Sequence, residues 1–181
     1  AFGQNVPDAA EPGYDLVLQA LTGIMAVTGE PDGQPHKVGV AWIDLMGGLY
    51  AAAGILAALR ARDATGEGRH LDVALFDVGV AAMANVAQSW LVTGSPPRRW
   101  GNAHAQIVPY QAFAAADGYL VVAAANDGQF ARLCRVLGGP CADLPADPRY
   151  ATNAARVTHR DRLVPILQEA FRARPLAHWL P

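Results

Sequence analysis

Carboxylates at two expected helix starts are the side chains of this sequence best placed to do chemistry. Asp44 lies between two short apolar stretches and opens a long segment of helical periodicity that ends near Arg62. The apolar flanks predict partial burial, and the amide hydrogens of a helix start favour an ionised carboxylate. A nucleophile and an ordinary N-cap both fit this position, and spacing alone favours the N-cap. Asp15, which follows Tyr14 at the start of another expected helix, has the same two interpretations.

The helix expected after Asp44 is rich in glycine and alanine. Glycine in a helix interior costs about 1 kcal/mol relative to alanine, so repeated small residues indicate that something approaches the backbone closely. A neighbouring helix would explain them, and so would a bulky ligand beside Gly47 and Gly48. Both interpretations remain open at this point.

Histidine, serine and cysteine offer few other candidates. His104 lies in the loop sequence Gly101-Asn102-Ala103-His104, where it is either solvent-exposed or a substrate contact. The five histidines lack metal-ligand spacing, neither serine lies in a GxSxG motif, and no phosphate-binding glycine loop occurs. We therefore expect no metal, and neither a serine hydrolase nor a phosphotransferase. Cys134 and Cys141 fit ordinary thiols of a reducing cytoplasm.

Composition excludes further classes of protein. The chain has 181 residues, of which 52% are hydrophobic and 17% charged, with a formal net charge of −2. Such a chain folds around a real core, and it has no electrostatic reason to bind nucleic acid or an anionic membrane. The longest apolar stretch, 45–59, is short for a bilayer span. We expect a cytoplasmic protein that binds neither nucleic acid nor membrane.

Periodicity and turn signals place the elements. Helices are expected at 14–28, 44–62, 76–91, 129–137 and 161–172, and strands at 69–75, 107–113 and 119–124. The last two strands flank Asp117-Gly118, a hairpin signal. A composition shift near 95–106 separates a helix-dominated part, 1–100, from a part with the hairpin, 101–181. The amphipathic end, 176–181, has no evident partner to pack against, and we expect a fragment of a longer polypeptide.

Taken together, these motifs resemble the family III CoA-transferases, the CaiB/BaiF family. The resemblance runs in order along essentially the whole chain. It rests on Phe2-Gly3-Gln4, Pro12-Gly13-Tyr14-Asp15, Gly29-Glu30-Pro31-Asp32-Gly33, Val38 to Tyr50, Thr65-Gly66-Glu67-Gly68-Arg69, Asp72 to Asp77, Gly101-Asn102-Ala103-His104, Ile107 to Gln111 and Thr152 to Val157.

The resemblance implies an α/β protein whose two parts belong to different domains of the family fold. Residues 1–100 would be the C-terminal, helix-rich portion of the CoA-binding large domain, with the catalytic aspartate. Residues 101–181 would be a small α+β domain containing the β-hairpin and incomplete at its C-terminus. Family members are about twice this length and form interlocked homodimers of ring-like chains.

The resemblance also implies an activity, in which Asp44 is the nucleophile. CoA would move from an acyl-CoA to another carboxylic acid through an aspartyl anhydride and an aspartyl-CoA thioester, with coenzyme A as substrate and no metal. Backbone amides beside Asp44 would stabilise the tetrahedral oxyanions. Substrate or CoA contacts would come from Tyr14, Asp15, Gly47, Gly48, Gly101, Asn102 and His104. The later motifs look most like members that use succinyl-CoA and other dicarboxylates.

Two alternatives remain beside this interpretation. Glu11 stands where the family often has a basic residue, and the N-terminal portion that supplies most CoA contacts is missing, so the chain could be a catalytically inert fragment. An α-methylacyl-CoA racemase would share the fold, but it would place a histidine where this chain has Tyr14. Tyrosine has an ordinary pKa near 10, which makes it a poor proton shuttle at neutral pH.

Overall fold

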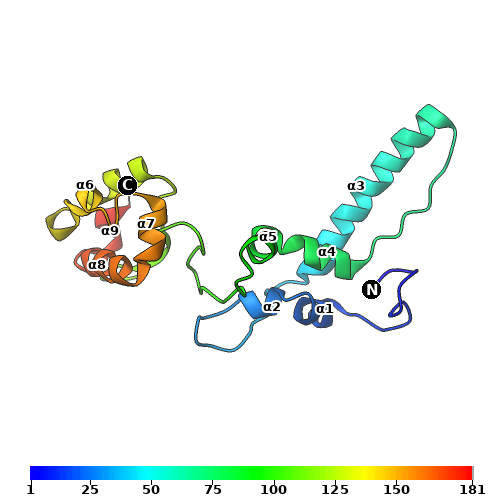
Figure 1. The fold of residues 1–181 in the computed structure, drawn as a ribbon, viewed down its shortest axis with the longest axis horizontal. Coiled ribbons are helices and arrows are strands. Elements are labelled where there is room, and N and C mark those ends of the chain that lie inside the picture. Colours follow the sequence, from blue (N-terminus) through cyan, green and yellow to red (C-terminus); the bar gives the residue numbers. More distant parts are fainter. Residues whose placement is uncertain (181) are drawn as a thin grey trace. The chain divides into compact units, whose positions relative to one another are not determined.

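The chain divides into two compact units. The computed structural model describes residues 1–180, and its units are Ala1–Gly101 and Asn102–Pro181 (Figure 1). The division falls one residue from the boundary expected at 100/101. The first unit is helical, and the second combines helices with a β-hairpin, which agrees with the expected helix-rich α/β class.

Five helices form the first unit. They are α1 (Asp15–Leu21), α2 (Ile24–Val27), α3 (Trp42–Thr65), α4 (Leu75–Ala82) and α5 (Ala84–Thr93). Two of the helices predicted from sequence are therefore each split into a pair. Gly23 breaks the first with a φ of +89°, a conformation that favours glycine, and Ala84 breaks the second with a φ of +41° and a 72° bend between α4 and α5.

Helices α1, α2 and α3 meet around a small core. Leu18 of α1, Ile24 of α2 and Ile43 of α3 are buried together. Gly79 of α4 allows the close approach, because a Cβ there would lie 2.6 Å from Thr22 Cγ2 and 3.0 Å from Ile43 Cδ1. This packing fixes Ile43, the neighbour of Asp44.

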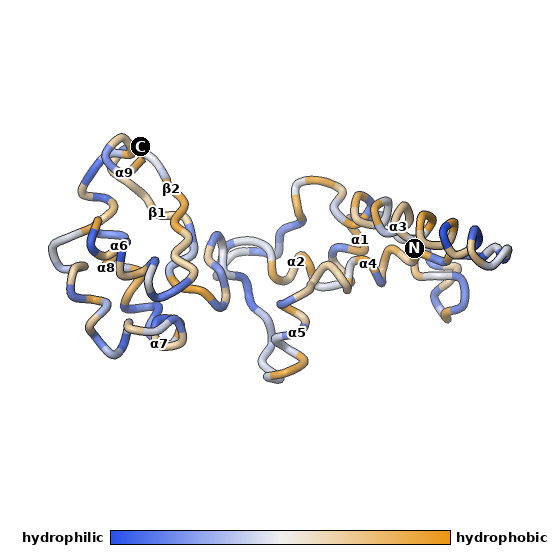
Figure 2. Tube along the Cα trace, turned by 90° about the horizontal axis from the view of Figure 1, so that it is seen from above, coloured by the Kyte–Doolittle hydropathy of each residue, from blue (hydrophilic) through white to orange (hydrophobic). Residues whose placement is uncertain are grey.

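Helix α3 extends well beyond this core (Figure 1). Hydrophobic residues recur along its length (Figure 2), and several of the large ones are exposed, namely Leu45, Leu49, Ile55 and Leu56. With 24 residues it is long and apolar enough to cross a membrane, as is the bent pair α4–α5 taken together, so the length argument made from sequence was wrong. Length and composition do not separate a membrane span from a core helix of a larger protein.

The strand predicted at 69–75 does not form. Among residues 1–180 the only sheet is the hairpin of the second unit, and the segment before α4 is irregular. A strand needs a neighbouring backbone to pair with, and the segment has none within the described chain. It is held instead by a side chain, since the Gln4 amide donates to Asp72 Oδ2 at 2.7 Å.

The second unit is built on the hairpin predicted from Asp117-Gly118. Strands β1 (Tyr110–Ala114) and β2 (Tyr119–Ala123) pair antiparallel, with Tyr110 opposite Ala123. The remaining elements are α6 (Asp127–Leu137), η1 (Gly139–Cys141), η2 (Leu144–Ala146), α7 (Asn153–Thr158), α8 (Arg160–Arg172) and α9 (Leu176–Trp179). Helices α6 and α8 confirm the two predicted in this part, and α8 is tied to β1 because Gln168 exchanges hydrogen bonds with both backbone groups of Ala114.

The expectation that the C-terminal amphipathic segment has nothing to pack against was wrong for its described residues, 176–180. The Trp179 ring contacts Phe171 edge-on at 5.3 Å, and its Nε1 donates to the Phe171 carbonyl at 3.0 Å. The Leu176 amide donates to Asp117 Oδ1 at 2.7 Å. The segment therefore closes over α8 and the hairpin turn.

Both cysteines are free thiols inside this second core. Burial, together with a smaller effect of the neighbouring Cys141, raises the pKa of Cys134 to about 12. Burial also raises the pKa of Cys141. Both thiols therefore stay protonated at neutral pH and are poor nucleophiles.

Candidate active site

Asp44 is an exposed carboxylate in the first turn of α3. The predictions of partial burial and of an N-cap role were both wrong. The N-cap residue is Ala41, and its side chain makes no capping hydrogen bond. The Asp44 side chain has no hydrogen-bond or ionic partner among residues 1–180, so it is free to react.

The cap of α3 is supplied by another helix. Asp15, the first residue of α1, accepts hydrogen bonds at Oδ1 from the Ile43 amide at 2.7 Å and from the Asp44 amide at 3.4 Å. A carboxylate bound to the first amides of a helix satisfies donors that have no partner within the helix. Asp15 thus reaches the backbone of the candidate nucleophile.

Gln19 holds Asp15 in place, and sequence reasoning missed it. It is fully buried, and its Nε2 donates to Asp15 Oδ2 at 2.6 Å. The same nitrogen lies 3.4 Å from the Val40 carbonyl, and Oε1 accepts from the Val38 amide at 2.8 Å. The signal was available, because a glutamine four residues after an aspartate shares its helix face.

The backbone amides beside Asp44 already have acceptors. Besides the two bound to Asp15, the Trp42 amide donates to the Val40 carbonyl at 2.8 Å and the Leu45 amide to the Ala41 carbonyl at 3.1 Å. In this structure these amides are already engaged, and their role as oxyanion donors stays a prediction.

Tyr14 flanks this junction at the N-terminus of α1. Its carbonyl accepts the Leu18 amide at 3.0 Å, and its side chain is 82% exposed. The structure thus brings Tyr14, Asp15 and Asp44 to one place, where α1 meets the start of α3.

The two glycines of α3 differ in their surroundings. Gly47 is buried, and a Cβ there would collide with Leu75 at the start of α4. Gly48 is exposed, with nothing within 4 Å of its added Cβ. Helix packing therefore accounts for Gly47, whereas the open face at Gly48 keeps room for a ligand.

Replacing these glycines one at a time should separate the two roles. Gly47→Ala forces the end of the Leu75 side chain aside, which costs about 1–3 kcal/mol of unfolding free energy, and the better helix propensity of alanine offsets about 1 kcal/mol, so we expect a net loss of up to about 2 kcal/mol. Gly48→Ala has no such contact and should be neutral or stabilising by up to about 1 kcal/mol. Urea unfolding of the two variants, followed by far-UV circular dichroism, measures the difference. Equal stabilities would contradict the packing assigned to Gly47.

The remaining candidates lie at the boundary between the units. Gly101 belongs to the first unit, where its amide donates to the Gly29 carbonyl at 3.0 Å and its φ of +58° favours glycine. Asn102 is exposed and belongs to the second unit, as does His104. All three were expected in the second part of the chain, 101–181; the structure places Gly101 in the first unit and the other two in the second.

His104 is half-buried and held on several sides. Its Nδ1 accepts the Gln106 amide at 3.0 Å, its own amide donates to the Tyr110 carbonyl at 2.9 Å, and the two rings lie 5.4 Å apart. Arg160 fixes the loop by donating to the carbonyls of His104 and Ala105 at 3.0 and 2.7 Å. With Nδ1 accepting, the ring proton of the neutral imidazole resides on Nε2.

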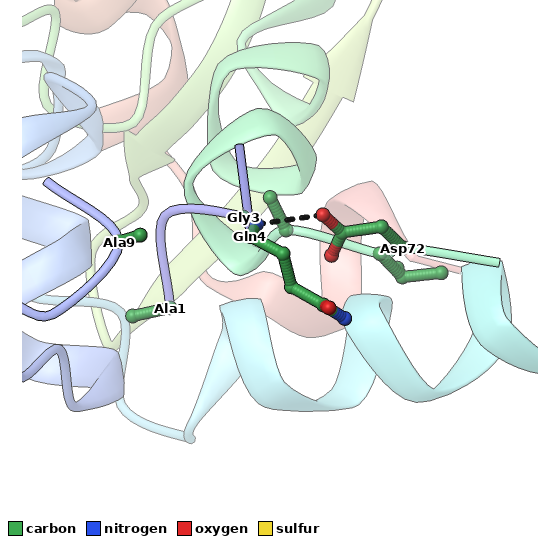
Figure 3. A pocket seen from close by; sticks show the side chains of 7 residues that line it. Ala1, Gly3, Gln4, Ala9 and Asp72 are labelled. Atoms are coloured by element: carbon green, nitrogen blue, oxygen red, sulfur yellow. Dashed lines mark hydrogen bonds between the residues drawn. The ribbon is translucent and has the colours of Figure 1, made fainter. Parts of the chain in front are cut away.

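A separate hollow of about 510 Å³ lies between the N-terminal segment and the segment before α4 (Figure 3). It is lined by Ala1, Gly3, Gln4, Ala9, Asp72, Val73 and Ala74. None of the candidate site residues lines it.

Within residues 1–180, no three His, Cys, Asp or Glu side chains gather as a metal site would require.

Comparisons with known proteins identify the family. The family model for CoA-transferase family III matches residues 1–181, and the chain belongs to this family. It is 51% identical over 160 residues to a succinate–glutarate CoA-transferase of Agrobacterium fabrum, covering 88% of this chain and 39% of that protein. It is 43% identical over 179 residues to the succinyl-CoA:glutarate CoA-transferase of Mus musculus, covering 99% of this chain and 41% of that one.

Solved structures agree with this assignment. A CaiB/BaiF family protein from Brucella suis matches with a TM-score of 0.74 and 45% identity, over 95% of this chain and 45% of that one. A hypothetical protein from Mycobacterium tuberculosis matches with a TM-score of 0.83 and 30% identity, over 99% of this chain and 47% of that one. The chain thus spans less than half the length of these relatives.

Proposed function

We propose that this chain is the nucleophile-bearing part of a CoA-transferase that exchanges CoA between succinyl-CoA and a second carboxylic acid. The observation that carries the proposal is Asp44, an exposed carboxylate without a protein partner on a backbone that Asp15 holds in place. Membership of CoA-transferase family III supplies the class of reaction.

The reaction begins at the Asp44 carboxylate. One of its oxygens attacks the thioester carbonyl of the acyl-CoA, CoA leaves as the thiolate, and a mixed anhydride forms. The thiolate then attacks the aspartyl carbonyl, releasing the first acid as its carboxylate and leaving an aspartyl-CoA thioester. The acceptor carboxylate repeats these two steps in reverse, which regenerates Asp44. A thioester is exchanged for a thioester, so the sequence balances without ATP.

Water must be kept from this carboxylate during turnover. A hydrated carboxylate is a weak nucleophile, and an anhydride exposed to water is hydrolysed. Asp44 is exposed within the present chain, and so is much of the apolar surface of α3. We propose that the rest of the full-length polypeptide and a second copy, in an interlocked homodimer, cover both.

The acid substrates are proposed to be dicarboxylates. Relatives are named for succinate, glutarate and mesaconate, and an Acetobacter aceti relative, 42% identical, is named for acetyl-CoA and oxalate. His104 supports this choice, because a neutral imidazole with its proton on Nε2 can donate to a carboxylate.

The two buried thiols, which are not bonded to each other, support a reducing, cytoplasmic location.

A panel of acceptor acids tests the function. The full-length enzyme is incubated with succinyl-CoA and each of several dicarboxylates, and the new CoA thioesters are separated by chromatography. We expect turnover with at least one dicarboxylate such as glutarate. Absence of any new thioester would contradict the proposal. Exchange of α-hydrogen for deuterium in D₂O with a 2-methylacyl-CoA and no acceptor would establish a racemase instead.

The 181-residue chain alone is expected to be inactive, because it spans less than half of its relatives. Isothermal titration with CoA checks this expectation. We expect no binding at micromolar concentration, and micromolar affinity would show that the chain holds its own CoA site.

A further inference from the structure

Asp15 and Gln19 form a hydrogen-bond network at the start of α3. Asp15 is half-buried, and both of its oxygens are engaged: Oδ1 accepts the Ile43 and Asp44 amides, and Oδ2 accepts Gln19 Nε2. An ionised carboxylate can accept about four hydrogen bonds, and three of these places are taken by groups of this chain. Its contacts run to the backbone of Asp44.

We propose that Asp15 is a positioning residue for Asp44, acting through the amides of residues 43 and 44, and that Gln19 fixes Asp15. The proposal rests on the proposed function of Asp44 as nucleophile. It assigns to Asp15 a backbone role in place of the substrate contact expected from the resemblance.

The charge of Asp15 matters as well as its geometry. The first amides of a helix carry a partial positive charge, and hydrogen bonds from them to an anion are stronger than those between neutral groups. In α3 that charge is taken up by Asp15, because its Oδ1 occupies two of these amides. Both of these amides donate to Asp15 and neither donates to the Asp44 side chain, so the Asp44 carboxylate oxygens carry no hydrogen bond from the start of the helix.

Gln19 determines which atoms donate and which accept in this hydrogen-bond network. Its Oε1 must face the Val38 amide, so its Nε2 faces Asp15 and requires an acceptor there. Asp15→Asn keeps an oxygen for the helix amides but turns an NH₂ group toward Gln19 Nε2. In the double variant Asp15→Asn with Gln19→Glu, a carboxylate at position 19 accepts from both Asn Nδ2 and the Val38 amide. The pairing of positions 15 and 19 is restored with its charge moved, and only the long contact to the Val40 carbonyl loses its donor.

The test uses the full-length enzyme and the rate at which the aspartyl-CoA thioester forms on Asp44 after rapid mixing with succinyl-CoA. A misplacement of about 1 Å at a reacting group can cost about 10²-fold in rate. We expect Asp15→Asn to slow this step by about 10²-fold, with the KM for succinyl-CoA within about threefold of wild type. The double variant should recover at least about tenfold of that loss. Asp77→Asn, an exposed first-turn aspartate of α4, should leave the rate unchanged.

Rates are counted per folded enzyme, determined by circular dichroism, so that a loss of folded protein does not mimic the effect. Thioester formation in Asp15→Asn within threefold of wild type would overturn the inference. A large rise in KM at an unchanged rate of thioester formation would overturn it too, because Asp15 would then be a substrate contact. If the wild type itself formed no thioester on Asp44, the proposed function would fail rather than this inference alone.

Discussion

Asp44→Asn should lower the kcat of the full-length enzyme by about 10⁴-fold or more. Loss of a covalent nucleophile has effects of this size or larger in other enzymes, and an amide cannot form the anhydride or the thioester. Because the Asp44 side chain has no partner among residues 1–180, the substitution should leave the fold of this chain unchanged. Steady-state turnover of succinyl-CoA with an acceptor dicarboxylate measures the loss.

Two comparisons make the Asp44 result interpretable. The variant should bind CoA with wild-type affinity, because the change removes one charge and no volume. Asp77→Asn makes the same chemical change at an exposed first-turn position of α4 and should keep full activity. An Asp44→Asn enzyme within tenfold of wild-type kcat would contradict covalent catalysis by this residue.

Arg156→Met should lower the unfolding free energy of the second unit by about 3–5 kcal/mol. The guanidinium is fully buried, and it donates from Nε to the Val108 carbonyl at 2.7 Å and from Nη1 to the Tyr150 carbonyl at 2.9 Å. Nη2 pairs with Asp127 at 2.9 Å, and the group lies 4.4 Å over the Phe130 ring. Removing it leaves two buried carbonyls without donors, each worth about 1–3 kcal/mol.

Urea unfolding of the 181-residue chain, followed by far-UV circular dichroism, measures this effect. Arg135→Met is the matched control, because Arg135 is exposed on α6, where surface changes usually stay within about 0.5 kcal/mol. A loss below 1 kcal/mol for Arg156→Met would show that the buried hydrogen bonds are replaced by other donors. The predicted order is wild type and Arg135→Met together, with Arg156→Met far below.

Helices and the hairpin were predictable where local signals are strong. The Asp117-Gly118 turn fixed the hairpin, and the amphipathic spacing of 129–137 and 161–172 indicated α6 and α8. Periodicity did not reveal the breaks at Gly23 and Ala84, because a backbone with positive φ leaves the apolar spacing on either side intact. The strand at 69–75 failed because alternation describes a face that can pair, not the presence of a partner.

The candidate site, too, could be predicted from sequence only in part. Position and neighbours singled out Asp44 and Asp15, but their roles depend on contacts between helices that spacing does not encode. Asp15, 28 positions before Ile43, caps α3 in place of Asp44, and the Asp44 side chain has no hydrogen-bond or ionic partner among residues 1–180. Gln19 and Arg160 escaped notice because a buried polar side chain is recognised by its partners, which the linear sequence does not name.

Chemical trapping on Asp44 tests the central claim most directly. The full-length enzyme is mixed with succinyl-CoA, quenched with hydroxylamine, digested and examined by peptide mass spectrometry. An acylated or thioesterified aspartate is converted to a hydroxamate, and we predict this modification on Asp44, dependent on succinyl-CoA and absent from Asp44→Asn. Full turnover with an unmodified Asp44, or with the hydroxamate on a different carboxylate, would contradict the account.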